Sequence, residues 1–227
     1  MTVWWFFDTL SRPYWKYFRM DGVFMKKWMK ILGIGLLLAS LFGVASLARD
    51  HRYLTEHVIR LHVVANSDSQ ADQQLKLRVR DGVTAFLADQ ADPNMTVEEA
   101  AQWVQGQLPQ LQKVAQSSAA AAGWTGDVRV SFDREAFPTR EYETFSLPAG
   151  VYRSLRITVG QGQGKNWWCV VFPSLCLPAT TEDFQDTAVS AGFSEELSDT
   201  LTGEKPYEIR FFLLDCLGWL ENFLFRK

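Results

Sequence analysis

The pattern of apolar and polar positions divides the chain into one continuous uncharged stretch and a longer region of alternating elements. Residues 31–47 (ILGIGLLLASLFGVASL) carry no charge, unlike the one-sided pattern of an amphipathic core helix. Residues 58–65 (VIRLHVVA) are rich in β-branched side chains and predict a strand. Residues from about 70 to 88 predict a helix, because their apolar positions recur at helical spacing. This stripe consists of Leu75, Val79, Val83 and Phe86.

A second helix is predicted after Asp92-Pro93-Asn94. Thr96 and Glu99 have the separation of a capping box, in which each side chain accepts a hydrogen bond from the backbone N–H of the other residue. Apolar positions at helical spacing continue to Ala115. Pro109 lies inside this pattern and predicts a kink or a split, because proline lacks the N–H group that a helix needs.

The remainder of the chain is richer in strands. Residues 128–132 alternate between apolar and polar side chains, which is typical of a half-buried strand. Residues 142–147 and 151–159 flank Pro148-Ala149-Gly150, a turn signal, and together predict a hairpin. Residues 167–172 (WWCVVF) are apolar on both faces and predict a central strand.

A short helix around residues 194–200 and a closing helix over residues 207–225 complete the predicted elements. The apolar stripe of the closing helix predicts a core-facing side. It consists of Leu213, Leu217, Leu220 and Leu224. The predicted fold class is therefore α+β, with an N-terminal strand, two helices, an antiparallel β-meander and a C-terminal helix.

The uncharged stretch has the parts of an export signal. Three lysines precede it within residues 26–30, and Ser46-Leu47-Ala48 places small residues where signal peptidase cuts, after Ala48. The stretch also approaches the length that spans a bilayer. Residues 25–48 are therefore a signal peptide or an uncleaved anchor that contacts the membrane through residues 31–47. The positive flank predicts that the remainder of the chain is exported.

Three further segments complete the predicted organisation. Residues 1–24 form an N-terminal extension that is longer than a signal needs, and a translation start at Met25 would explain it. Residues 49–57 (RDHRYLTEH) predict a short polar tether. Residues 58–227 predict a single domain, whose length is sufficient for its own core.

Charge is distributed unevenly along the chain. The 227 residues include 23 basic and 26 acidic side chains, a net charge of −3. Residues 1–48 hold six of the basic and two of the acidic ones, which leaves 17 basic and 24 acidic side chains, or −7, in residues 49–227. An acidic body argues against nucleic-acid binding, which needs a basic face. The apolar content of 47% excludes a disordered chain.

Candidate chemistry in the exported part is sparse. The histidines at positions 51, 57 and 62 have no partner at metal-ligand spacing, and no Gly-x-Ser-x-Gly elbow marks a nucleophile. The sequence therefore predicts neither a metal nor a cofactor. Cys169 and Cys176 lie on either side of Pro173, which favours a disulfide in an oxidising compartment. The alternative is that these two and Cys216 are small buried apolar side chains.

Polar residues gather around the first strand-to-helix junction. Arg60, Asn66, Asp68 and Arg80 are the members that we single out. Taken alone, the cluster is better explained by a capped helix with a solvated, salt-bridged face, whose exposed ion pairs contribute little to stability, than by a binding surface.

Several blocks of sequence carry a resemblance to a known family. They are Ile59–Ser69 (IRLHVVANSDS), Phe137–Arg140 (FPTR), Leu147–Tyr152 (LPAGVY), Gly164–Pro173 (GKNWWCVVFP) and Pro206–Arg210 (PYEIR). With these blocks in this order, residues 58–215 resemble the stage II sporulation protein R family.

The resemblance implies a secreted signalling protein of endospore-forming bacteria. Such proteins are made in the forespore and exported into the space between the two membranes. There they activate a membrane-embedded aspartic-type protease of the mother cell, which leads to cleavage of pro-sigma E. A signal of this kind is not an enzyme and needs a binding surface. We expect that surface first at Arg60, Asn66, Asp68 and Arg80, and second at Arg140, Trp167 and Trp168.

Two other functions compete with this interpretation. One is an exported hydrolase that acts on the cell wall between the membranes and needs a pair of carboxylates. Its candidate residues are Asp133, Glu135, Glu141 and Glu143. The other is a membrane-anchored scaffold with an extracytoplasmic domain, which requires that the leader stays uncleaved.

Overall fold

The computed structural model describes most of the chain. The described residues are 22–92, 94–142, 145–173, 189, 193–202 and 208–225. The chain forms two compact units, residues 1–46 and residues 47–227, and each is considered by itself.

Helix α1 (Gly22–His57) starts in the first unit and continues into the second. In the first unit its side chains are exposed from Met25 to Ala45, and the mean hydropathy of its most apolar window is 2.3. The helix is long and apolar enough to cross a membrane, which fits the predicted signal peptide or anchor. Ala48 is exposed within α1, and cleavage after it stays a prediction.

Residues 49–57 are helical, whereas their composition predicts a polar tether. This last part of α1 packs within the second unit. Leu54 is fully buried, and Nε2 of His51 lies 3.0 Å from the carbonyl oxygen of Ala149. A few buried side chains hold the segment in place. The prediction missed them because the segment is polar on average.

A four-stranded sheet in the order β2–β5–β1–β6 forms the centre of the second unit. Its strands are β2 (Val128–Phe137), β5 (Gly150–Val159), β1 (Ile59–Val64) and β6 (Asn166–Phe172). β5 runs antiparallel to β2 and parallel to β1, and β6 runs antiparallel to β1. The predicted α+β class is confirmed.

The strands do not follow one another as a continuous meander, because β1 lies between β5 and β6. All six residues of β1 are buried, which suits a central strand. β6 lies at the edge of the sheet, although its sequence predicts a central position. Its tryptophans are partly covered by arginine side chains from other elements rather than by a second neighbouring strand.

The predicted hairpin of residues 142–147 and 151–159 does not form. β5 pairs along its ten residues with β2, which extends to Phe137 and therefore offers a longer ladder than a hairpin across Pro148 would. The short strands β3 (Arg140–Glu141) and β4 (Ser146–Leu147) pair with each other instead.

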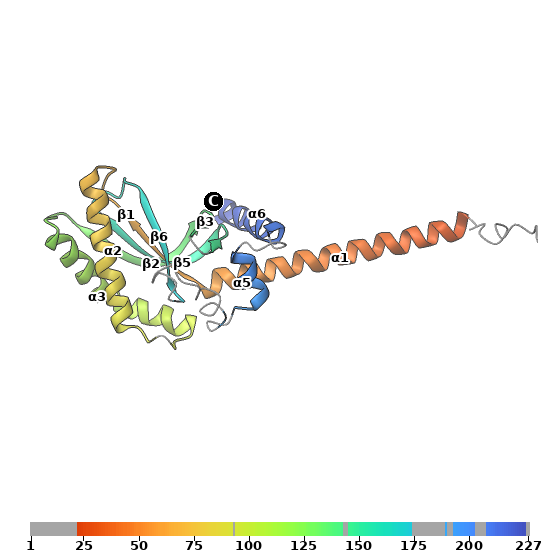
Figure 1. The fold of residues 1–227 in the computed structure, drawn as a ribbon, viewed down its shortest axis with the longest axis horizontal. Helices are drawn as coiled ribbons and strands as arrows, with labels where there is room; N and C mark the ends of the chain where they lie inside the picture. Colours follow the sequence, from red (N-terminus) through yellow and green to blue (C-terminus); the bar gives the residue numbers. More distant parts are fainter. Residues whose placement is uncertain are drawn as a thin grey trace, which may run out of the picture. The chain divides into compact units, whose positions relative to one another are not determined.

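Helices α2 (Gln70–Gln90) and α3 (Val97–Ala121) cover one face of the sheet (Figure 1). The predicted stripe of α2 packs there against Leu61, Leu155 and Ile157. The capping box that starts α3 is confirmed.

Pro109 does not split α3, which continues across it as one helix. The proline side chain is exposed, and the buried residues Val104 and Leu111 lie on either side of it along the chain. Packing on both sides holds the helix together where one backbone hydrogen bond is missing.

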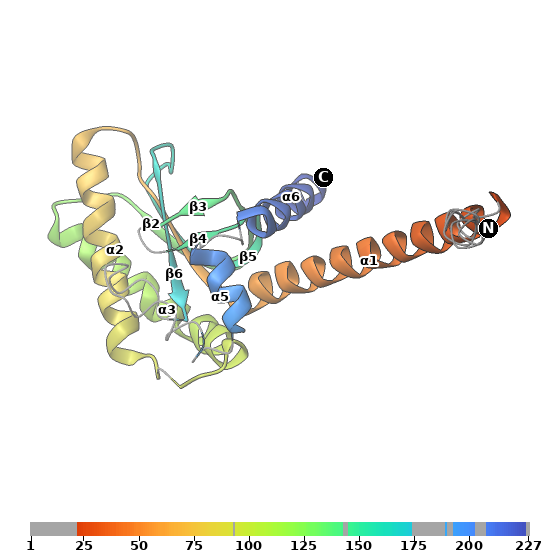
Figure 2. The same cartoon turned by 45° about the vertical axis from the view of Figure 1, so that its right-hand side comes forward.

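Helices α5 (Glu195–Thr202) and α6 (Glu208–Phe225) lie against the other face, together with the last turns of α1 (Figure 2). The closing helix is confirmed in position, but its orientation differs from the prediction. Leu213, Leu220 and Leu224 of the expected core stripe are 42%, 56% and 59% exposed, whereas Leu214 is fully buried. Asp215 and Glu221 of α6 accept hydrogen bonds from the backbone N–H groups of Ala149 and Val151, and these bonds set the orientation.

Candidate binding surface

Two adjacent tryptophans on the edge strand β6 each lie beneath an arginine. Successive strand residues point to opposite faces, so Trp167 packs with the α2–α3 core and Trp168 with the core on the other side. The guanidinium carbon of Arg80, in α2, lies 4.7 Å from the Trp167 ring centre. That of Arg140, in β3, lies 3.5 Å from the Trp168 ring centre. The structure therefore brings Arg80 of the first predicted cluster into contact with Trp167 of the second.

Asn66 and Asp68 have a structural role that their sequence context does not reveal. The Asn66 side chain donates to Asp72 over 3.0 Å and accepts from the backbone N–H of Gln161 over 3.0 Å. Asp68 accepts from the backbone N–H of Lys165 over 2.7 Å. Both residues thus fasten the loop that connects β5 to β6.

Asp72 anchors the same junction. Hydrogen bonds from Ser67 and Asn66 lower the pKa of its carboxyl group, with a smaller contribution from Ser69, whose hydroxyl accepts the N–H of Asp72 as the N-cap of α2. The carboxylate is thereby kept ionised. The junction is a hydrogen-bonded cap rather than an array of surface ion pairs.

Arg60 is fully buried, which contradicts its predicted place on a binding surface. Its guanidinium carbon lies 4.2 Å from the ring centre of Phe137 and 4.9 Å from that of Tyr152, and it donates to the Tyr142 hydroxyl over 3.0 Å. Burial raises the pKa of Tyr152, whose hydroxyl donates to the carbonyl of Pro148. Strand β1 is buried along its whole length, so even a charged residue there faces the interior.

Arg140 is short of hydrogen-bond and ion-pair partners. Burial lowers the pKa of its guanidinium group, and repulsion from Arg60 lowers it further. No ion pair to Arg140 forms within the described residues, and its Nε is buried without a hydrogen-bond partner there, as are Nε and Nη1 of Arg60. Arg140 therefore keeps donor groups that no described carboxylate pairs with, and a partly exposed arginine of this kind favours an incoming carboxylate.

His62 is 6% exposed and lies beneath the same surface, a position that was not predicted from the sequence. Its ring stacks on Trp168 with 5.5 Å between ring centres and 23° between planes. Its Nδ1 lies 2.9 Å from Glu135. Arg140, Trp168 and His62 therefore form one stack from β3, β6 and β1. The alternation of β1 was the available signal, since it directs His62 to the face opposite Leu61 and Val63.

The Glu135 carboxylate accepts hydrogen bonds from three side chains, and this makes it a poor candidate for the hydrolase alternative. Besides His62, it accepts from Ser154 over 2.9 Å and from Arg156 over 2.8 Å. Burial raises the pKa of its carboxyl, but these hydrogen bonds and charges outweigh burial, and the pKa lies below its ordinary value. A general acid needs the opposite shift.

The other carboxylates of the hydrolase alternative do not join Glu135. Asp133 and Glu141 are exposed, and Glu143 lies outside the described residues. Within the described part of the chain, no group of three or more His, Cys, Asp or Glu side chains is arranged to hold a metal ion.

The cysteines are only partly described. Cys169 is 7% exposed in β6, and Cys216 is a free, exposed thiol in α6. Cys169 forms a disulfide. Its predicted partner Cys176 lies outside the described residues, so the pairing of these two cysteines stays a prediction.

The fold and the surface together define an α+β domain behind an apolar N-terminal helix. Residues 55–182 match the model of the stage II sporulation protein R family, and the chain belongs to this family. Stage II sporulation protein R of Bacillus subtilis (strain 168) is 32% identical over 183 residues, which cover 73% of this chain and 82% of that relative. No solved structure matches the chain. Membership of the family supports a role in sporulation.

Proposed function

We propose that this protein is an exported signal of endospore formation that acts by binding and not by catalysis. It is exported from the forespore into the space between the two membranes. There it binds and activates a membrane-embedded aspartic-type protease of the mother cell, which leads to cleavage of pro-sigma E. Membership of the family and the apolar N-terminal helix support this proposal.

The observation that carries the binding role is the stack of Arg140 on Trp168. Arginine and tryptophan are enriched among the residues that dominate the energy of protein interfaces. Trp168 holds the guanidinium plane, and Arg140 makes no ion pair within the described residues. A carboxylate of the protease can therefore bind to Arg140 with two parallel N–H···O bonds. Arg80 on Trp167 is the secondary contact, since Asp81 already pairs with Arg80.

Reconstitution in a non-sporulating host tests the proposal. The full chain is expressed with the protease and pro-sigma E, and the length of the sigma factor is followed on a gel. We expect cleavage with the unaltered chain and much less with Arg140→Ala. Arg78→Ala is the matched control, because Arg78 is an exposed arginine of α2, and it should act like the unaltered chain.

The outcomes distinguish the proposed function from the proposed binding surface. Cleavage that needs the chain and is lost in Arg140→Ala supports both the function and the surface. Cleavage that both variants preserve would refute the surface and leave the function standing. No cleavage by a folded and exported chain would refute the function itself.

A further inference from the structure

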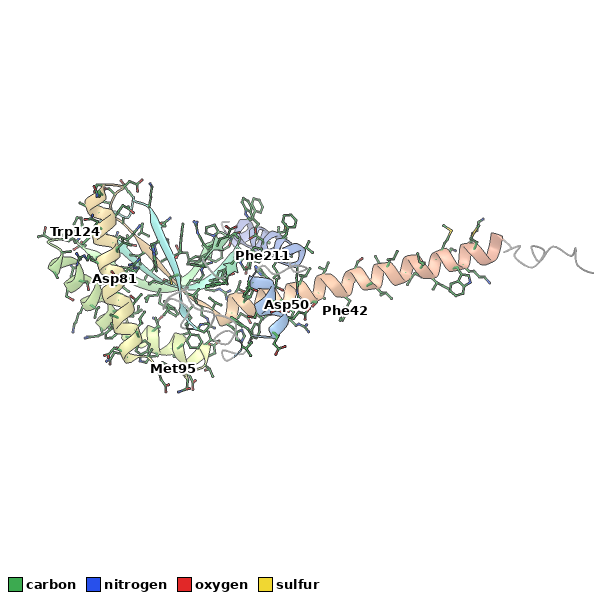
Figure 3. All side chains as sticks on the ribbon, viewed as in Figure 1. Phe42, Asp50, Asp81, Met95, Trp124 and Phe211 are labelled. Carbon is green, nitrogen blue, oxygen red and sulfur yellow. The ribbon has the colours of Figure 1, made fainter. Side chains whose placement is uncertain are left out.

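Helix α6 presents its apolar side to the outside of the second unit. The exposed fractions of five large apolar side chains lie between 42% and 68%. They are Phe212, Leu213, Trp219, Leu220 and Leu224. Together with Cys216 between them, these positions recur every three to four residues along the helix, so they form one continuous stripe with Cys216 at its centre. Side chains project from α6 over this stretch in Figure 3.

The polar side chains of α6 point inward and bind the rest of the unit. Arg210 pairs with Asp50 over 2.6 Å, and Asp215 accepts the backbone N–H of Ala149 over 2.9 Å. Glu221 accepts the N–H of Val151 over 3.1 Å, and Asn222 donates to the carbonyl of Phe137 over 2.8 Å. The usual arrangement of a surface helix is therefore reversed.

These bonds fix the orientation of the helix. A rotation that buried the apolar stripe would break the hydrogen bonds that Asp215 and Glu221 accept from the N–H groups of Ala149 and Val151, and unpaired buried backbone N–H groups are costly. Gly218 also lies so close to the Ala149 carbonyl that a turned helix could not occupy the same place. The apolar stripe is thus a permanent surface, and exposed patches of this kind mark contacts with proteins or membranes.

The chain itself indicates which contact this is. The uncharged part of α1 ends at Leu47, where the second unit begins. Asp50, three residues later, holds Arg210 near the start of α6. Three residues of helix span about 4.5 Å. If residues 31–47 lie in a bilayer, chain connectivity therefore keeps the start of α6 close to that bilayer's surface.

We propose that the outward face of α6 lies in the interfacial layer of a lipid bilayer. Tryptophan and other aromatic side chains favour this layer, and a helix with one apolar side binds in its plane. Trp219 and Phe212 provide such side chains, with Leu213, Leu220 and Leu224 beside them. This contact is independent of protease activation. It would keep the second unit on the membrane surface even after cleavage at Ala48.

The native thiol at the centre of the stripe provides the test. The full chain is reconstituted in vesicles of phosphatidylcholine and phosphatidylglycerol, and Cys216 is labelled with an environment-sensitive fluorophore. Quenching is measured with nitroxide-labelled lipid and with a water-soluble quencher. The matched control carries the label at position 78, in an Arg78→Cys chain that also has Cys216→Ser. A chain with Cys216→Ser alone measures labelling of any other thiol.

We expect lipid nitroxide to quench the label at Cys216 several-fold more strongly than the label at position 78, with the opposite order for the water-soluble quencher. A Trp219→Ser, Leu220→Gln variant should reduce the lipid quenching. These side chains are exposed, so the fold should persist, and circular dichroism checks this. Equal quenching at the two positions would overturn the proposal. Shielding of Cys216 from both quenchers would also overturn it, and would assign the face to a protein contact.

Discussion

At the scale of single residues, the surface is a stack in which charge lies on aromatic rings. Arg140 lies on Trp168, and His62 stacks with the same indole. Burial, and to a smaller extent repulsion from Arg60, lowers the pKa of Arg140. We expect a carboxylate of a bound partner to stabilise the positive charge that burial and Arg60 disfavour.

Replacing Arg140 by lysine distinguishes the contribution of its positive charge from that of its planar guanidinium group. Arg140→Lys keeps the positive charge, but it loses the planar group that stacks on Trp168 and that binds a carboxylate with two N–H groups. We expect binding of protease-containing membranes to fall almost as far as in Arg140→Ala, by about 30-fold, the equivalent of about 2 kcal/mol for an interface anchor. Titration binding measures this loss. Full binding by the lysine variant would show that charge alone is sufficient.

Glu135 predicts a pH-dependent contribution to stability. Its folded-state pKa is depressed, so the carboxylate stabilises the folded chain above the ordinary value of 4.5, and this contribution is lost as the pH falls through the folded-state pKa. Glu135→Gln should lower the free energy of unfolding at pH 7 by about 1 to 3 kcal/mol. The difference should shrink below pH 4.5. Urea unfolding across this range measures it, with the exposed Glu141→Gln as control.

A constant difference at every pH would mean that hydrogen bonding, and not the charge of Glu135, stabilises the site. We expect the pH-dependent result. Ser154, which donates to Glu135, is 1% exposed, so this hydrogen bond lies largely away from water, where the charge of Glu135 has a stronger effect.

At the scale of elements, the helices could be predicted from the sequence, whereas the order of the strands could not. The apolar spacing of α2 and the capping box of α3 are local signals, and both appear where they are predicted. The place of β1 between β5 and β6 depends on pairing between residues about 90 or more positions apart, which no local pattern encodes. The same holds for Arg80 on Trp167, whose residue types are visible in the sequence but whose contact is not.

The predicted orientation of α6 was wrong for a different reason. Its leucine spacing predicts a core stripe, and the assumption that apolar side chains point inward decides which side is buried. Asp215 and Glu221 reverse that choice, because they bind backbone N–H groups of the sheet. Only the tertiary structure shows that those N–H groups are there to be bound.

The contact between α6 and the sheet predicts an intolerant glycine. A Cβ atom at Gly218 would collide with the carbonyl of Ala149, so Gly218→Ala should lower the free energy of unfolding by about 1 to 3 kcal/mol. Gly106→Ala is the control, since nothing lies within 4 Å of the added Cβ in α3. It should stabilise the chain by about 0.5 to 1 kcal/mol. Urea unfolding of both variants, followed by tryptophan fluorescence, measures the two shifts; equal shifts would contradict the predicted collision.

At the scale of the whole molecule, we expect the apolar part of α1 to determine on which side of the membrane the second unit acts. A chain without residues 25–48 should keep pro-sigma E at full length in the reconstituted host, because the binding surface then stays on the cytoplasmic side. The full chain should cleave it. Gel analysis of the sigma factor compares the two, and fractionation of the cells locates each chain. Cleavage by the leaderless chain would remove the functional meaning of export.

The position of β1 also determines when the molecule is complete. β1 is the first strand to leave the ribosome, yet its neighbours in the sheet begin only at Gly150 and Asn166. Until β5 and β6 have been made, the backbone groups along both edges of β1 are unpaired. Pairing between strands so far apart in the sequence is also slow. Trp168 meets His62 only when β6 docks on β1. A chain that stalls before β6, the last of the described strands, therefore lacks the Trp168–His62 contact of the proposed binding surface.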